Sequence, residues 1–76
     1  MKELLEYIAK SLVDYPADVS VTESESGNTT VLELRVNEAD MGKVIGKQGR
    51  IAKSIRAVVK AAASRENKKA VVEIMQ

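Results

Sequence analysis

Hydrophobic residues near the start of the chain recur with the spacing of a helix. Within residues 2–13, one arc of the helix carries Leu4, Leu5, Ile8 and Leu12. Charged residues fill the remaining arc, which predicts an amphipathic helix. Pro16 should end it, because proline biases the preceding residue away from the helical conformation.

Two stretches then alternate between apolar and polar residues, as half-buried strands do. The first contains Val19 and Val21, and the second covers residues 31–36. Residues 26–29 form a turn signal between them. We expect the two strands to pair as an antiparallel hairpin.

The second half of the chain predicts two helices and a strand. Asn37 is a suitable N-cap for a short helix over residues 38–45, which Gly46 should stop. A longer helix is expected over residues 49–64, and a final strand over 70–75.

Both helices of this pair should bury one side. We expect Ile45 to be buried beside the break. In the longer helix, the expected apolar arc is Ile51, Ile55, Val58, Val59 and Ala62, and the opposite arc carries Lys53, Arg56 and Lys60.

The predicted order is therefore α-β-β-α-α-β in a single domain spanning residues 1–76. Three short strands cannot close into a barrel. The expected fold class is α+β, with three helices packed on one face of a three-stranded sheet and the other face open to water.

Charge divides the chain in two. Residues 1–41 hold three Lys and Arg residues against nine Asp and Glu, whereas residues 42–69 hold nine against one. A basic segment on an otherwise balanced protein points one face toward an anionic partner. The alternative is that the charge asymmetry arises by chance or serves solubility and intramolecular attraction, with no ligand on the basic face.

Composition argues against catalysis, cofactors and metals. The 76 residues include no Cys and no His, which removes thiolate ligands, the commonest metal ligand and the usual general base. Glu23 and Glu25 flank a predicted turn and are expected to be solvated. The first residues do not form a signal peptide and no apolar run could span a membrane, so a cytoplasmic protein is expected.

A glycine-flanked basic loop, Gly46-Lys47-Gln48-Gly49, stands at the centre of the basic segment. Two glycines alone could serve only the turn between two helices. That reading does not explain the surrounding cations. A nucleotide-binding P-loop is excluded by the glycine spacing and by Gln48, where a Mg²⁺-binding hydroxyl is required.

Residues 40–56 resemble the core signature of a KH domain, with its I-G-x-x-G loop at Ile45 to Gly49. The predicted element order resembles the type II KH topology. The chain length is similar to that of small bacterial KhpA-type RNA-binding proteins.

The resemblance implies single-stranded RNA as ligand and a cytoplasmic role as an RNA chaperone or post-transcriptional regulator. It also implies a homodimer, or a heterodimer with a larger KH-containing partner of the KhpB type. Cell-shape phenotypes are attached to the family, although no residue here indicates them.

KH loops clamp the backbone of about four nucleotides. In this sequence, the resemblance implies that Gly46 and Gly49 let the RNA backbone approach closely. Lys47 would then supply positive charge to a phosphate, and Gln48 would hydrogen-bond a phosphate or a ribose. The remaining expected RNA-binding residues are Lys43, Arg50, Lys53 and Arg56. The opposing wall is expected from the second strand, around residues 32–36.

The two aromatic residues, Tyr7 and Tyr15, lie in the acidic half and are expected in core or partner packing. A stripe of small residues on the long helix is either a dimer seam or a sign of helix propensity alone; it comprises Ser54, Ala57, Ala61 and Ser64. A protein-interaction adaptor that does not read RNA is the alternative function.

Overall fold

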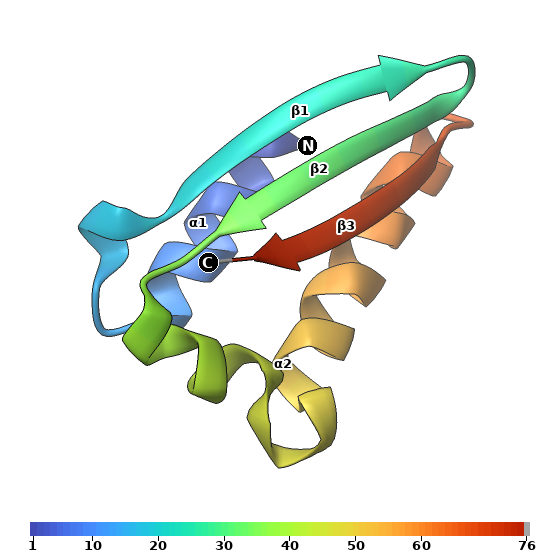
Figure 1. Cartoon of the computed structure of the whole chain (residues 1–76). Coiled ribbons are helices and arrows are strands. Elements are labelled where there is room, and N and C mark those ends of the chain that lie inside the picture. Colours follow the sequence, from blue (N-terminus) through green and yellow to red (C-terminus); the bar gives the residue numbers. More distant parts are fainter. Residues whose placement is uncertain (76) are drawn as a thin grey trace.

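The computed structural model describes residues 1–75, with the side chains of residues 47 and 48 outside the description. Its elements follow the predicted order (Figure 1). They are helix α1 (Lys2–Leu12), a single 3₁₀ turn η1 (Pro16–Asp18), strands β1 (Ser20–Ser26) and β2 (Thr29–Arg35), helix α2 (Glu38–Arg65) and strand β3 (Lys69–Met75).

The three strands form one sheet in the order β1-β2-β3. β1 and β2 pair antiparallel, which confirms the hairpin, and Ser26 lies opposite Thr29. Gly27, the first residue of the two-residue turn, has a φ of +61°, which fits a type II′ hairpin turn. β2 and β3 pair parallel, so α2 serves as the crossover that parallel neighbours require.

The core lies between one face of the sheet and the helices. Figure 1 shows α1 and the later part of α2 behind the strands, with the opposite sheet face uncovered. Along β2, burial alternates, so that Thr30, Leu32 and Leu34 point toward the helices. The main buried apolar side chains are Leu5, Ala9, Val21, Leu32, Leu34, Val36, Ile55, Val59 and Val72.

Helix α2 bends at Gly49. Its helical assignment is continuous from Glu38 to Arg65, but the φ of Gly49 is +69°, which an unbroken right-handed helix does not contain. Two arms, residues 38–48 and 50–65, therefore run in different directions (Figure 1). With each arm counted as a helix, the expected three helices are present. The break was expected at Gly46, which instead lies within the first arm.

Burial along the first arm also differs from the expectation. Ile45, expected in the core, is 47% exposed, whereas Val44 is 1% exposed. Because residues four apart share a helix face, Val44 lies on the same side as the buried Asp40.

The buried stripe of the second arm is also rotated from its expected position. Val58 is exposed, and the buried residues are Ala52, Ile55, Val59 and Ala63. Tyr7 and Tyr15 are exposed as well, so their expected core packing is wrong for this chain on its own.

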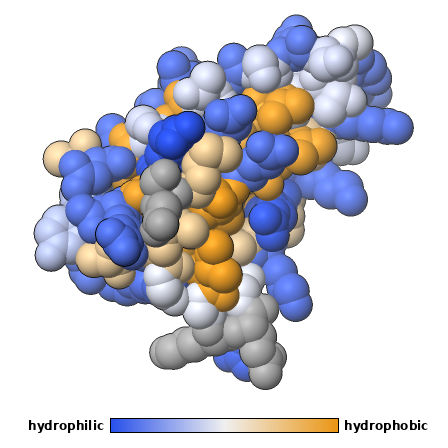
Figure 2. All heavy atoms as spheres, in the orientation of Figure 1, coloured by the Kyte–Doolittle hydropathy of each residue, from blue (hydrophilic) through white to orange (hydrophobic). Residues whose placement is uncertain are grey.

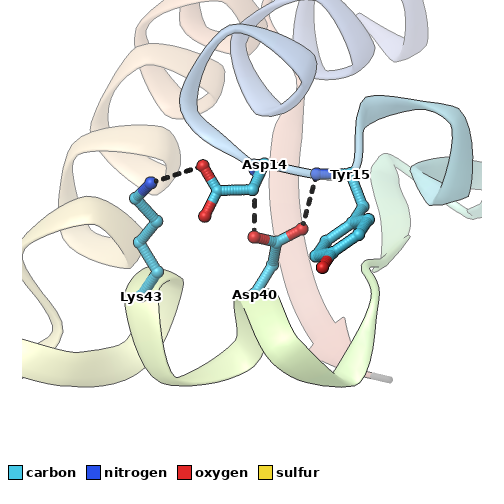
Figure 3. Close-up of polar contacts among 4 residues, drawn as sticks. All are labelled: Asp14, Tyr15, Asp40 and Lys43. Carbon is cyan, nitrogen blue, oxygen red and sulfur yellow. Dashed lines mark hydrogen bonds and ion pairs between the residues drawn. The ribbon is translucent and has the colours of Figure 1, made fainter.

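Asp40 fastens the first arm to the segment that follows α1 (Figure 3). Its buried carboxylate accepts hydrogen bonds from the backbone N–H groups of Asp14 (3.0 Å) and Tyr15 (3.1 Å). The Asn37 side chain accepts from the Ala39 N–H at 2.7 Å, which confirms the expected N-cap. The start of α2 is thus fixed at two points before the bend is reached.

The corrected burial predicts opposite outcomes for two neighbouring residues. Val44→Asn places an amide at a fully buried position and should lower the free energy of unfolding by roughly 2–5 kcal/mol. Ile45→Asn, at an exposed position, should change it by less than about 1 kcal/mol. Urea denaturation followed by circular dichroism measures both. Equal destabilisation by the two substitutions would contradict the observed phase of the first arm.

Candidate nucleic-acid interface

The GKQG loop lies at the bend of α2, at one end of the molecule (Figure 1). Gly49 needs its left-handed backbone conformation, which side chains with a Cβ atom rarely adopt. Gly46 has no such φ, and a Cβ atom built on it meets no atom within 4 Å. Packing within the chain therefore does not require glycine at position 46. Its missing side chain instead leaves open space over the loop.

Basic side chains line the second arm beyond the loop. Arg50, Lys53 and Arg56 are all exposed, as is Lys60 one turn later. At 100° per residue, these four positions fall within an arc of about 120°. The structure therefore places three of the expected RNA-binding residues on one side of one helix.

A hollow of about 260 Å³ separates this basic side from the edge of the sheet. Its lining residues are Arg56, Lys60, Ala70, Val71 and Val72. The Arg56 Nε donates a hydrogen bond to the Val72 carbonyl oxygen at 3.3 Å, which joins the two walls. Because a guanidinium has five N–H donors, that bond leaves other donors of Arg56 available to a ligand.

The opposing wall of this groove is β3, so the expectation that residues 32–36 of β2 would form it is wrong. β2 is the central strand, and Leu32 and Leu34 are fully buried in the core. β3 occupies the edge beside α2 and exposes 46% of Val71. The missed signal was topological, since a strand that follows a crossover helix commonly pairs parallel beside the strand before it.

The uncovered face combines apolar and polar surface. Figure 2 shows hydrophobic atoms in a band between hydrophilic flanks, directed from the sheet toward the bend of α2. Of the exposed large apolar side chains, Val71 lines the hollow next to Arg56. A groove with an apolar floor and a cationic rim suits a ligand that has both flat bases and charged phosphates.

Lys43 stands apart from the other expected RNA-binding residues. It belongs to the first arm, and its Nζ lies 3.1 Å from the Asp14 carboxylate (Figure 3). Both side chains are well exposed, and pairs of this kind contribute at most about 1 kcal/mol. An incoming phosphate could therefore exchange for Asp14. The expected roles of Lys47 and Gln48 concern side chains outside the described part of the chain.

Within residues 1–75, no group of three or more Asp and Glu side chains lies together as a metal site would require. The helices described for these residues include none that is long and apolar enough to cross a membrane.

Comparison with known proteins agrees with the geometry. A family model described as the KH domain of KhpA/KhpB matches residues 2–74. The RNA-binding protein KhpA of Clostridium perfringens is 68% identical over 75 residues, covering 99% of this chain and all of that protein. Its counterpart in Clostridium acetobutylicum is 64% identical with the same coverage.

Among solved structures, Era from Aquifex aeolicus superposes with a TM-score of 0.67 over 97% of this chain and 29% of that chain. At 21% identity this likeness concerns the fold alone. The full-length matches and the family model lead to one conclusion: the chain belongs to the KhpA/KhpB family of KH domains.

Proposed function

We propose that this protein binds single-stranded RNA by holding the RNA backbone at the GKQG loop. The observation that carries the proposal is the groove with a cationic rim that begins beside the GKQG loop, where Gly46 leaves the backbone open to a ligand. The names of the similar KhpA proteins, which describe them as RNA-binding, support the same ligand.

In this mechanism the loop lets the RNA backbone come close, and charge holds it there. Lys47 and Gln48 serve a phosphate and its ribose, as KH loops do. Arg50, Lys53 and Arg56 extend the contact along the second arm. Exposed Val71 offers an apolar surface to a base or a sugar. The chemistry is binding, and no step breaks or forms a covalent bond.

Sequence discrimination by this groove should be weak. Base stacking on aromatic side chains contributes about 1–3 kcal/mol per base in single-strand binders. Tyr7 belongs to α1 and Tyr15 follows it, and neither lines the groove. A module of this kind gains affinity when two copies act on one RNA. This suits a chaperone or post-transcriptional regulator that contacts many RNAs in the cytoplasm.

A second copy of the chain, or a larger KH-containing partner, fits the side of α2 that carries the small residues. Ser54, Ala57, Ala61 and Ser64 are all exposed. Beside Ala61 is a hollow of about 490 Å³, whose lining includes Leu4 and Val58. These two apolar side chains are 37% and 43% exposed, so a partner helix would cover them.

The loop contact is tested by reversing its charge. Lys47→Asp with Gln48→Asp should weaken binding to a short unstructured RNA by about tenfold or more, because two anions replace the phosphate-binding groups. The matched control is Lys10→Asp with Ser11→Asp on α1, which changes net charge equally at exposed positions. Fluorescence anisotropy at several salt concentrations measures both. Equal losses in the two double variants would exclude a specific loop contact.

The open space above Gly46 predicts opposite effects on stability and binding. Gly46→Ala should raise the free energy of unfolding by about 0.5–1 kcal/mol, because alanine favours helix. The same methyl group should weaken RNA binding several-fold by holding the backbone away. Gly42→Ala, one turn earlier and equally open, controls for helix stabilisation and should affect binding less. Undiminished RNA affinity in Gly46→Ala would contradict close approach at this residue.

The small-residue side predicts self-association. Ala61→Phe should give monomers and reduce RNA affinity through lost avidity, since the ring would push the paired helices apart. Ser24→Phe, exposed on β1, is the control and should leave assembly unchanged. Analytical ultracentrifugation at equal concentrations distinguishes them. If wild type and Ala61→Phe sediment as the same oligomer, the seam lies elsewhere, and a monomeric wild type favours the larger partner.

A further inference from the structure

A second cationic hollow lies at the far end of the groove, beside the β1–β2 turn. Its volume is about 420 Å³, and its lining residues are Thr29, Lys60, Ser64, Lys68, Lys69, Ala70 and Val71. The lining contains three lysines and no carboxylate. Lys60, Ala70 and Val71 also line the hollow next to Arg56, so the two hollows are continuous. The groove therefore continues past Arg56 and Lys60 to the end of α2 and the start of β3.

Two lysines of this far hollow, Lys68 and Lys69, directly follow a regular helix cap. Asn67 takes a φ of +57° directly after α2. The Lys68 N–H bonds to the Ala63 carbonyl oxygen at 2.9 Å, and the Asn67 N–H bonds to that of Ser64 at 3.1 Å. This pair of bonds is the Schellman motif, with asparagine in the place usually taken by glycine.

The hairpin turn fixes the same segment from the other side. The Lys69 N–H bonds to the Asn28 carbonyl oxygen at 3.1 Å, and the Asn28 side-chain amide donates to the Asn67 carbonyl oxygen at 3.3 Å. The backbone that carries Lys68 and Lys69 is thus tied to both α2 and the sheet. Little backbone entropy remains to be lost when an anion binds there.

One carboxylate competes for this site. The Lys68 Nζ lies 3.2 Å from Glu25 of β1, and both side chains are well exposed. A pair of this exposure contributes at most about 1 kcal/mol, so a phosphate can displace it. Glu25 therefore weakens anion binding without closing the site.

We propose that the far hollow is a second backbone site for the same RNA strand, which binds a phosphate several nucleotides from the one held by the loop. This rests on the proposed function of the loop. Gly49 and Lys60 are eleven residues apart on α2, about 16 Å along the axis. One phosphate cannot reach both ends, so the two sites need separate nucleotides. Lys60 and Val71 line both hollows, and the hydroxyl of Thr29 in the far hollow can bond phosphate or the 2′-OH.

Length dependence tests this inference. Random-sequence single-stranded RNAs of about four and about twelve nucleotides are titrated against two proteins. One is the wild type, and the other is the double variant that combines Lys68→Ala and Lys69→Ala. The short RNA should bind both proteins within about twofold, because the loop fills with about four nucleotides. The long RNA should bind the variant about tenfold more weakly, with a salt dependence shallower by about 0.7 in log–log slope for the one lost phosphate contact.

The control is Lys2→Ala with Lys10→Ala, which removes the same charge from exposed positions on α1. It should behave as wild type with both RNAs. A Glu25→Gln variant frees Lys68 and should strengthen binding of the long RNA several-fold, whereas Glu23→Gln, on the same strand with the same charge change, should not.

Three outcomes would overturn the inference. Wild-type affinity of the Lys68/Lys69 variant for the long RNA would show that the hollow takes no phosphate. Equal losses of affinity for the short and the long RNA would show that these lysines act at the loop site, or only through long-range electrostatic attraction. If wild type binds neither RNA, the proposed function itself fails, and the second site fails with it.

Discussion

The left-handed backbone of Gly49 is the constraint on which the arrangement depends. A straight helix of 28 residues would be about 42 Å long. The longest dimension of the molecule is 34 Å. A straight α2 would therefore project beyond the sheet and could not return the chain to pair β3 beside β2. By bending at one glycine, α2 covers the core with its second arm and leaves the GKQG loop at the outside of the bend.

Each arm of α2 is bonded to a neighbouring segment on its own side of the loop, so the position of the loop is restrained from both sides. Asp40 secures the first arm through two backbone N–H groups, and Arg56 joins the second arm to β3. Near the loop, residues that the fold requires are neighbours of residues that it does not require. Val44 is buried while Ile45 is exposed, and Gly49 is required by its φ while Gly46 is not. This separation allows the loop to carry a ligand without a cost to the core.

Much of the fold follows from local patterns in the sequence. Helix α1, the β1–β2 hairpin and the Asn37 cap each depend on neighbours in the chain, and each is present in the structure. Helix α1 buries Leu5 and Ala9, whereas Leu4 and Leu12 of the expected arc are exposed. The misplaced features depend on longer-range facts. Both glycines of the loop can stop a helix, and the expectation placed the break at the first. Whether Val44 or Ile45 is buried depends on how the first arm packs against the rest of the chain.

The groove was harder to predict than the loop. Alternation identifies β2 and β3 as strands but does not order them, so the sequence could not show that β3 forms the wall or that Val71 is exposed there. The Lys68–Lys69 hollow depends on contacts between Asn28 and Asn67, which are 39 residues apart. The resemblance to KH domains pointed to residues 40–56 because a motif is local, and a groove built from separated segments is not.

The most direct measurement of the central claim is an NMR titration of the ¹⁵N-labelled protein with a short single-stranded RNA. The account predicts that the largest amide shifts fall on residues 46–50, continue along the second arm of α2, and reach β3 around Val71. Amides of α1 and β1, in the acidic part of the chain, should remain nearly unchanged. Shifts confined to α1 and β1, or absent throughout at saturating RNA, would contradict it.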